Sequence, residues 1–439
     1  MKTISRILVF SIPCLLATAC GGDDSGDDSS EDDGEDDGGV DAAPEACVLE
    51  AGGICTIAGS GEASYSGDNG PALLATFSLP TDTVTGPDGT LYILDWNNHR
   101  VRKLTAEGTI EHVAGRGELG GGLDEPALSD FNHLSNAIFN QAGTRLVIAA
   151  WHNSQIREFD FATQEIHTTC GDGRRAYFGD GGPALTAALD LPASIAYAPN
   201  GDLVIMDQAN QVLRSVDAEG NIHRLAGQCI IDTPPPAGPG PCETPVQCPG
   251  GSGKLTCGDP AATCGSACNT AYAPGNADTI RMFQPFGQSA DPAGRIVFDA
   301  DGNLLFADTD NSIIRKLDMK TREVSIVAGL EPVKGVAQKG YAGDGGPATE
   351  ATLNRPVDLA LGTDGTLYFT DVFNHCVRAV APDGTISTVV GQCGQRGYEG
   401  DGGPASQAKL KLPYGIEYVD GVLYVSDSGN YVIRAVELE

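Results

Sequence analysis

The sequence predicts an all-β fold, a six-bladed β-propeller with four-stranded blades. The first observation is a repeat: short apolar runs end in glycine at regular intervals of 56 residues and then resume after two longer intervals, at Gly59, Gly115, Gly171, Gly227, Gly329 and Gly391. A fixed period of this size indicates an array of supersecondary units, each packed against its neighbours. The longest interval, between Gly227 and Gly329, indicates an insertion.

The second observation is the pattern inside each unit. Two β-rich runs flank a short polar turn, as in LYILDWNNHRVRK at residues 91–103 and LYFTDVFNHCVRA at residues 367–379. A Gly-containing turn and another apolar run come first, so four short strands per unit are expected, as in a propeller blade. The last unit stops after its third strand, and residues 53–58 are expected to supply the missing outer strand and leave no open sheet edge.

These residues carry a family resemblance. The recurring D-x-x-N-x-x-[IVL]-R core, the G-D-G-G-P-A loop at 179–184, 343–348 and 400–405, and the closing V-A-G resemble the NHL repeat of six-bladed propellers. Two blades depart from the pattern: Ala150 replaces the Asp of the second blade, and only Gly275-Asn276-Ala277 remains of the loop in the fourth. The resemblance implies a propeller over residues 47–439.

The N-terminus is typical of an export signal. Lys2 and Arg6 precede an apolar run too short to span a bilayer, and the Ala-Thr-Ala before Cys20 resembles a bacterial lipobox. We expect a signal peptide over 1–19, lipidation of Cys20, and an acidic disordered tether over 20–46. The expected location is the cell envelope outside the cytoplasm, with the outer membrane favoured and with membrane contact through the lipid anchor only.

The cysteines fit an oxidising compartment. A Cys-rich insertion is expected over 228–274, and disulfides are favoured over a metal site because paired C-x-x-C units are missing there. The connectivity stays open. Cys376, within a strand, is a candidate for a free thiol. The disulfide candidates are Cys47, Cys55, Cys229, Cys242, Cys248, Cys257, Cys264 and Cys268.

The charge of the chain argues against one class of partner. Its formal net charge is −32 at pH 7, and the acidic segment over 23–45 accounts for only part of it. An acidic surface repels phosphate backbones, so nucleic-acid binding is not expected.

The fixed Asp and Asn of each repeat are interpreted as structural. An Asp that ends a strand and an Asn three residues later satisfy the backbone donors of a tight turn. We therefore expect neither a metal ring nor a cofactor, and we expect the recurrent Arg to tie blades together. The turn residues are Asp95, Asn98, Asp207, Asn210, Asp308, Asn311, Asp371, Asn374, Asp427 and Asn430.

The two positions between the fixed Asp and Asn vary from blade to blade. Variable residues on a rigid scaffold are how a propeller recognises a partner, although aromatic residues here could equally fill gaps between blades. The resulting candidate binding residues are Trp96, Trp151, His152, Asp310 and Phe373.

The favoured hypothesis is a monomeric, lipid-anchored binding or scaffold propeller that recognises a protein, peptide or glycan through its long-loop face. The alternative is a metal-dependent lyase or hydrolase with a site at the central channel, for which His99, His152 and His375 are the candidates. A purely structural envelope protein is the third possibility. A binding module is favoured over an enzyme because no catalytic motif is present.

Overall fold

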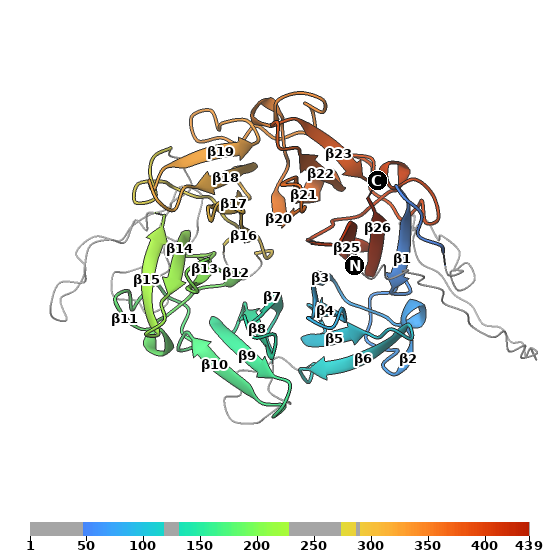
Figure 1. The fold of residues 1–439 in the computed structure, drawn as a ribbon, viewed down its shortest axis with the longest axis horizontal. Helices are drawn as coiled ribbons and strands as arrows, with labels where there is room; N and C mark the ends of the chain where they lie inside the picture. Colours follow the sequence, from blue (N-terminus) through green and yellow to red (C-terminus); the bar gives the residue numbers. More distant parts are fainter. Residues whose placement is uncertain (1–46, 118–130, 228–273, 287–289, 439) are drawn as a thin grey trace, which may run out of the picture.

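The computed structural model describes residues 47–117, 131–227, 274–286 and 290–438. Six antiparallel sheets surround a central axis, and Figure 1 shows them along that axis. The predicted all-β, six-bladed propeller is confirmed. Within these ranges no helix is long and apolar enough to cross a membrane. The helices there are single 3-10 turns: η1 (Ala72–Leu74), η2 (Ala184–Thr186), η4 (Ala348–Glu350), η5 (Val372–Asn374), η6 (Ala405–Gln407) and η7 (Ser428–Asn430).

Each blade is numbered by its innermost strand, which borders the axis. The inner strands of blades 1 to 6 are β3 (Pro80–Thr85), β7 (Leu134–Phe139), β12 (Pro192–Tyr197), β16 (Ile296–Phe298), β20 (Pro356–Leu361) and β24 (Gly415–Val419). The second strands are β4 (Leu91–Asp95), β8 (Arg145–Ala150), β13 (Leu203–Asp207), β17 (Leu304–Asp308), β21 (Leu367–Asp371) and β25 (Val422–Asp427). The third strands are β5 (Arg100–Leu104), β9 (Gln155–Asp160), β14 (Val212–Val216), β18 (Ile313–Leu317), β22 (Cys376–Val380) and β26 (Val432–Glu437).

The outer strands confirm how the ring closes. Blades 1 to 5 end in β6 (Thr109–Ala114), β10 (Ile166–Cys170), β15 (Asn221–Ala226), β19 (Val324–Ala328) and β23 (Ile386–Val390). In blade 6 the outer strand is β1 (Ile54–Ala58) from the start of the described chain, and Ile54 pairs with Val436 of β26. Figure 1 shows this blue strand beside the dark red ones.

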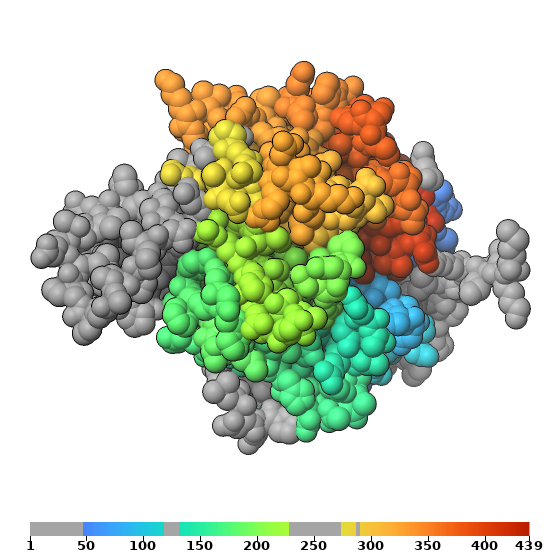
Figure 2. Space-filling view, turned by 60° about the vertical axis from the view of Figure 1, so that its left-hand side comes forward, coloured from blue at the N-terminus to red at the C-terminus, as the bar shows by residue number. Residues whose placement is uncertain are grey.

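The core is divided among the gaps between blades. Separate clusters of buried residues join neighbouring blades, as where Leu305 of blade 4 and Phe369 of blade 5 belong to one cluster. Figure 2 shows green blade 3 packed closely against the yellow and orange blade 4. This distribution is what a ring of repeats requires, because each blade can bury its faces only against its neighbours.

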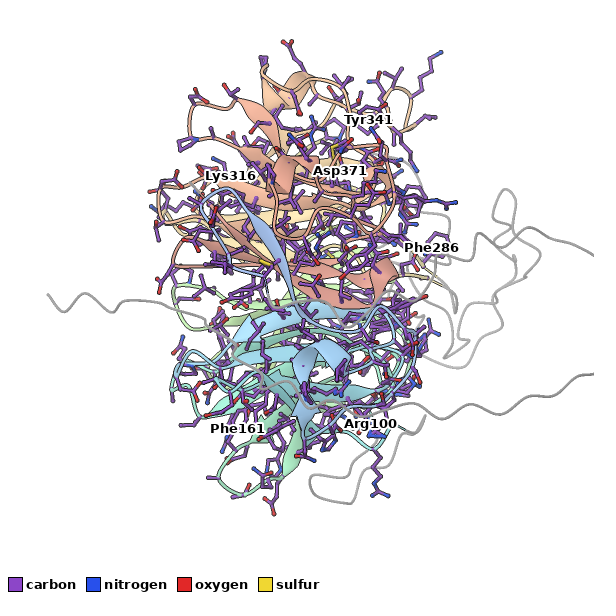
Figure 3. The ribbon with its side chains drawn as sticks, turned by 90° about the vertical axis from the view of Figure 1, so that its right-hand side faces the viewer. Arg100, Phe161, Phe286, Lys316, Tyr341 and Asp371 are labelled. Atoms are coloured by element: carbon purple, nitrogen blue, oxygen red, sulfur yellow. A yellow bond between two sulfur atoms is a disulfide. The ribbon has the colours of Figure 1, made fainter. Side chains whose placement is uncertain are left out.

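The two faces of the disc are distinguished by their turns. The upper face carries the turns between second and third strands, such as 96–99, and the lower face carries the short hairpin turns, such as 86–90 and 161–165. Figure 3 shows the disc edge-on, with Phe286 and Arg100 toward the upper face and Phe161 and Lys316 toward the lower face.

The G-D-G-G-P-A loops lie mainly along the perimeter of the disc. They start at the upper face but run along the perimeter, where β2 (Gly70–Pro71) and β11 (Gly182–Pro183) add a fifth strand to blades 1 and 3. The backbone N–H of Ala72 donates to the carbonyl of Gly108 in a lower-face turn. The loops therefore cover sheet edges, which explains their uniformity.

Candidate functional site

The fixed Asp and Asn form the turn that the sequence predicts. In blade 1, Asp95 accepts the backbone N–H of Ser78 at 2.8 Å and the side-chain amide of Asn98 at 2.9 Å. Asn98 also donates to the carbonyl of Ser64. The same pairs recur with buried aspartates at Asp207 and Asn210, Asp308 and Asn311, Asp371 and Asn374, and Asp427 and Asn430.

The recurrent Arg ties each of these turns to the perimeter loop. Arg214 lies fully buried and contacts Asp180 of the loop at 2.7 Å and Asp207 of the turn at 3.3 Å. It also donates to the carbonyl of Ala188, which makes it a clamp between the third strand and the chain entering the blade. We call this arrangement the arginine clamp. It recurs at Arg102, Arg378 and Arg434.

The variable pair between Asp and Asn consists of a buried first residue and a second residue that is exposed or half-buried in four of the six blades. The first member is buried in all six blades, and the exposed fraction is 5% for Trp96 and 1% for Trp151. The two indoles pack 5.1 Å apart, and Trp151 donates to the side-chain oxygen of Gln208 in blade 3. The expectation that these tryptophans form an exposed binding surface is therefore wrong, because they fill the gaps between blades.

The candidate histidines His99, His152 and His375 lie in the turns of the upper face and do not converge on the channel. His152 contacts His133, a residue that the sequence analysis missed, and His133 in turn meets the ring of His99 edge-on. Burial, together with the two neighbouring histidines, lowers the pKa of His133 to about 3. Nδ1 of His99 accepts a backbone N–H from blade 2, and Nδ1 of His375 accepts the equivalent one from blade 6. This geometry gives them the role of joining neighbouring blades.

Two of the second residues of the variable pairs do come together on the upper face. Arg355 forms an ion pair with Asp310 at 3.0 Å, and its guanidinium lies 4.7 Å from the ring centre of Phe373. Phe373 is 39% exposed, and Phe286 is a further exposed aromatic residue on this face. His152 is separate from this group, at the boundary between blades 1 and 2.

The cysteines correct one expectation. The disulfide candidates Cys47 and Cys55 are bonded to each other, whereas Cys376 is not free but is bonded to Cys393. Among the described residues the free cysteine is Cys170, which is buried. The pairing was missed because Cys393 lies in a loop outside the repeat pattern. The insertion cysteines, Cys229, Cys242, Cys248, Cys257, Cys264 and Cys268, and the lipidation candidate Cys20 lie outside the described residues.

The central channel holds a ring of polar residues that the sequence analysis missed. These residues share one position in the blades. In blade 1, Asp82 of the inner strand pairs with Leu94, the residue just before the turn aspartate Asp95. Several of these residues accept a backbone N–H from the next blade: Asp82 from Ala137, Asn136 from Ile195. The six positions of this inner ring are occupied by Asp82, Asn136, Ser194, Arg295, Asp358 and Gly415.

Arg295 crosses the channel and closes it. From blade 4 its guanidinium reaches Asp82 on blade 1 at 3.2 Å and the carbonyl of Ser135 on blade 2. Arg295 is only 1% exposed. Because the inner strands run from the upper to the lower face and Arg295 directly precedes β16, the closure lies toward the upper face.

Below Arg295 the channel widens into a cavity of about 410 Å³ lined by all six inner strands. Its lining includes the later residues of these strands, such as Phe139, Tyr197 and Glu417, so it extends toward the lower face. We call this cavity the funnel. A concave site with a few convergent polar groups is the usual form of a small-ligand site.

The funnel has two chemically different walls. Blades 5, 6 and 1 contribute the carboxylates of Asp358, Glu417 and Asp82. Blades 2, 3 and 4 contribute the aromatic residues Phe139, Tyr197 and Phe298. Burial raises the pKa of Asp358 to about 7 and that of Glu417 to about 8. Burial also raises the pKa of Asp82, against the opposing effect of Arg295.

A sequence signal for the inner ring existed. Three inner strands start with proline, and the ring residue stands two positions later, as in Pro80-Thr81-Asp82 and Pro356-Val357-Asp358. Aligning these strands would have shown a polar residue at a position where a buried strand is normally apolar. Among the described residues no group of three or more His, Cys, Asp or Glu is arranged to hold a metal ion.

The closed ring of four-stranded blades around a polar channel defines a six-bladed β-propeller. Residues 77–104 match the NHL repeat, and residues 320–397 match the Teneurin NHL domain. The first match covers the three inner strands of blade 1, and the second covers blade 5 with the end of blade 4. The chain is thus a six-bladed propeller that carries NHL-repeat matches in these two stretches.

Curated relatives are distant and much longer. SUPPRESSOR OF QUENCHING 1 of Arabidopsis thaliana is 24% identical over 334 residues, which cover 75% of this chain and 27% of that protein. Teneurin-3 of Mus musculus is 25% identical over 402 residues, which cover 84% of this chain and 13% of that protein. The chain thus spans about a quarter or less of the length of these relatives.

Solved structures share the fold at low identity. A protein of Bacteroides thetaiotaomicron described as an auxiliary nutrient binding protein is 15% identical with a TM-score of 0.54, and the match covers 87% of this chain and 75% of that one. One of Bacteroides ovatus with the same description is 14% identical with a TM-score of 0.55 over 87% and 75% of the two chains. These likenesses show the fold alone.

Proposed function

We propose that this chain is a binding propeller that receives a small polar ligand, or a side chain of a partner, in the funnel. The single observation that carries the proposal is the shape of the channel: Arg295 closes it toward the upper face, and a cavity of about 410 Å³ extends below toward the lower face. A channel closed at one end holds a ligand, whereas an apolar packed axis would only hold blades together.

Binding is favoured over catalysis by what the funnel contains. Its carboxylates accept backbone N–H groups of neighbouring blades, as Asp358 does from Ile416, so they are held in place. The histidines considered for a lyase lie outside the funnel lining. The two solved propellers described as auxiliary nutrient binding proteins agree with a binding role for this fold, although they share only the fold.

The location of the protein follows from its N-terminus in this proposal. Lipidation of Cys20 would anchor the chain outside the cytoplasm, in the outer membrane. The polypeptide enters β1 at the lower face, since Gly52 bonds to Glu437 at the far end of β26. The funnel therefore extends toward the side from which the tether leaves, where a ligand of the envelope could enter it.

A second surface, on the upper face, is where we propose that a protein, peptide or glycan partner binds. Exposed Phe373 lies over Arg355, and Arg355 is held by Asp310 and Asp291 on the upper face. An aromatic residue beside an oriented guanidinium is a common binding anchor. If this surface recognises a partner, Phe373→Ala should abolish its capture by the secreted chain, while Phe178→Ala at the perimeter should not.

The test of the funnel uses a variant that fills it. We suggest equilibrium dialysis of the secreted chain, with Cys20→Ser to prevent anchoring, against an extract of small molecules, followed by mass spectrometry. Ala196 lines the funnel, and Ala196→Trp should remove any compound that the parent retains. Ala187→Gly, outside the funnel lining, controls for a general loss of fold. Equal retention by parent and filled variant would contradict a funnel site.

A further inference from the structure

The asymmetry of the funnel indicates what it binds. Resting on the proposed function above, we infer that the funnel is a site for an aliphatic ammonium group, carried either by a free amine or by a lysine side chain. One half of its wall is acidic and the other half is aromatic, which suits a ligand with a positive end and an apolar chain.

The acidic half of the funnel has more carboxylates than positively charged groups to balance them. Asp82, Asp358 and Glu417 line the funnel, and one guanidinium, that of Arg295, contacts this group through Asp82 at 3.2 Å. Among the described residues, Glu417 accepts hydrogen bonds from Thr85 alone, whose backbone N–H and hydroxyl donate to its two oxygens at 2.7 and 3.0 Å. Each carboxylate oxygen has more than one lone pair, so these groups keep capacity for a further donor.

The aromatic half complements an ammonium group in a second way. Phe139, Tyr197 and Phe298 line the opposite wall, on three consecutive blades. The face of an aromatic ring attracts a cation, and the same ring packs well on methylene groups. A hydrated metal ion would use the carboxylates, but it has no methylene groups to pack on this wall.

An independent observation is a buried hydroxyl that lacks a hydrogen-bond partner which a ligand could supply. Thr83 lines the funnel and is only 3% exposed, and its buried hydroxyl makes no hydrogen bond with any of the described residues. A buried hydroxyl without a partner is costly, so such groups are rare in native proteins. An ammonium group has three donors, and one of them can bond this oxygen while others bond carboxylates.

The protonation state of the funnel supports the same ligand. The charged or titratable groups around it are Asp82 on β3, Arg295 before β16, Asp358 on β20, Glu417 on β24 and Tyr197 on β12, while β7 contributes the uncharged Asn136. The raised pKa values of Asp358 and Glu417 follow from burial without sufficient positive charge. A bound cation would reverse that effect, so binding near pH 7 should release protons.

The experiment compares matched probes on the secreted chain with Cys20→Ser. Calorimetry at pH 7 would use Nα-acetyl-lysine methylamide, its neutral counterpart Nα-acetyl-norleucine methylamide, and putrescine as a free amine. We expect the charged probes to bind at least about tenfold more tightly than the neutral one, a difference of about 1.4 kcal/mol. Heats that vary with the buffer would report the released protons. The lysine and putrescine arms distinguish a partner's side chain from a free amine.

Two funnel variants and a perimeter control test the assignment. Glu417→Gln should weaken the charged probes about tenfold or more, while Glu399→Gln, whose carboxylate pairs with Lys409 at the perimeter, should leave them unchanged. Thr83→Val keeps the shape of the side chain and removes only the hydroxyl. It should weaken binding several-fold without lowering the melting temperature, which a purely structural role for Thr83 would not produce.

The experiments distinguish a wrong ligand class from a wrong proposed function. If neutral probes, such as sugars, bind in the funnel and ammonium compounds do not, the ligand class is wrong while the proposed function stands. If calcium or magnesium binds in their place, the inference is likewise overturned. If nothing binds and Ala196→Trp changes no retained compound, the inference and the proposed function fail together.

Discussion

The perimeter of this propeller repeats the same residues from blade to blade, whereas the axis does not. At the perimeter the arginine clamp has the same chemistry in four blades, as at Arg102 and Arg214. Around the axis no two blades place the same residue in the inner ring except for Asp82 and Asp358. Uniformity at the perimeter reflects one task, stabilising every blade, while variety at the axis is what a ligand site requires. The predictions below test that division, from the largest expected effect to the smallest.

The largest effect should come from breaking a clamp. Arg214→Met removes the cation between Asp180 and Asp207 and leaves Asp207 buried without its charge partner. Removing one partner of a buried ion pair costs about 3–5 kcal/mol. The free energy of unfolding, measured by chemical denaturation, should fall by that amount.

A surface arginine provides the control for the clamp. Arg145 forms two ion pairs on the exposed part of blade 2, with Glu158 and Asp160. Arg145→Met should hardly change the unfolding midpoint, because exposed pairs are weak and screened. Equal losses for the two variants would show that burial of the clamp is not what makes it strong.

The second prediction concerns the buried ion pair at the axis. Arg295→Met removes the cation that bridges the channel to Asp82, and we expect a loss of about 3 kcal/mol at pH 8. At pH 5 the loss should be smaller, because protons neutralise the buried carboxylates. The double variant Arg295→Met/Asp82→Asn should recover part of the loss. A loss that is equal at both pH values would contradict a charge-based role.

The clamp could be predicted from the sequence because it is repeated. The D-x-x-N turn at Asp95 and Asn98 and the Arg on the strand that directly follows the turn recur in register, so each copy supports the interpretation of the others. The position of Trp96 and Trp151 could not be predicted in this way. Their variability indicated recognition, but whether a turn residue points outward or into the gap between blades depends on the packing of two neighbouring sheets.

The funnel was missed for a related physical reason. Asp82 and Asp358 stand in short inner strands that read as apolar core segments, and the channel exists only once six such strands meet. Arg295 reaches Asp82 across 213 positions of the chain, a contact that no local pattern encodes. The Cys376–Cys393 disulfide was missed because it joins a repeat residue to a loop residue outside the repeat.

The third prediction concerns the one inner-ring position without a side chain. A Cβ at Gly415 would lie 2.5 Å from the carbonyl oxygen of Thr81 and 2.9 Å from the Cα of Asp82. Gly415→Ala should therefore push blade 6 from blade 1 and cost about 1–3 kcal/mol, the usual range for overpacking. At Gly403 in the perimeter loop a Cβ meets only ordinary contact at 3.4 Å, and Gly403→Ala should be tolerated. Thermal unfolding of both variants checks the difference.

The smallest effect, counted per pH unit, is a change in how stability depends on pH. Burial raises the pKa of Glu417 to about 8 from its ordinary value of 4.5, so between these values the folded state holds a proton that the unfolded state has released. Stability should therefore be highest at low pH in this window and fall as pH rises toward 8, with a slope from this group of up to about 1.4 kcal/mol per pH unit.

Glu417→Gln removes that titration while its side-chain oxygen can still accept the backbone N–H of Thr85. Denaturation at pH 5, 6.5 and 8 should show a shallower decline for the variant than for the parent, whereas Glu399→Gln at the perimeter should follow the parent. An unchanged slope would mean that Glu417 is ionised throughout the window and already has its charge balanced, and the axis would then lack the excess of acidic groups that sets it apart from the perimeter.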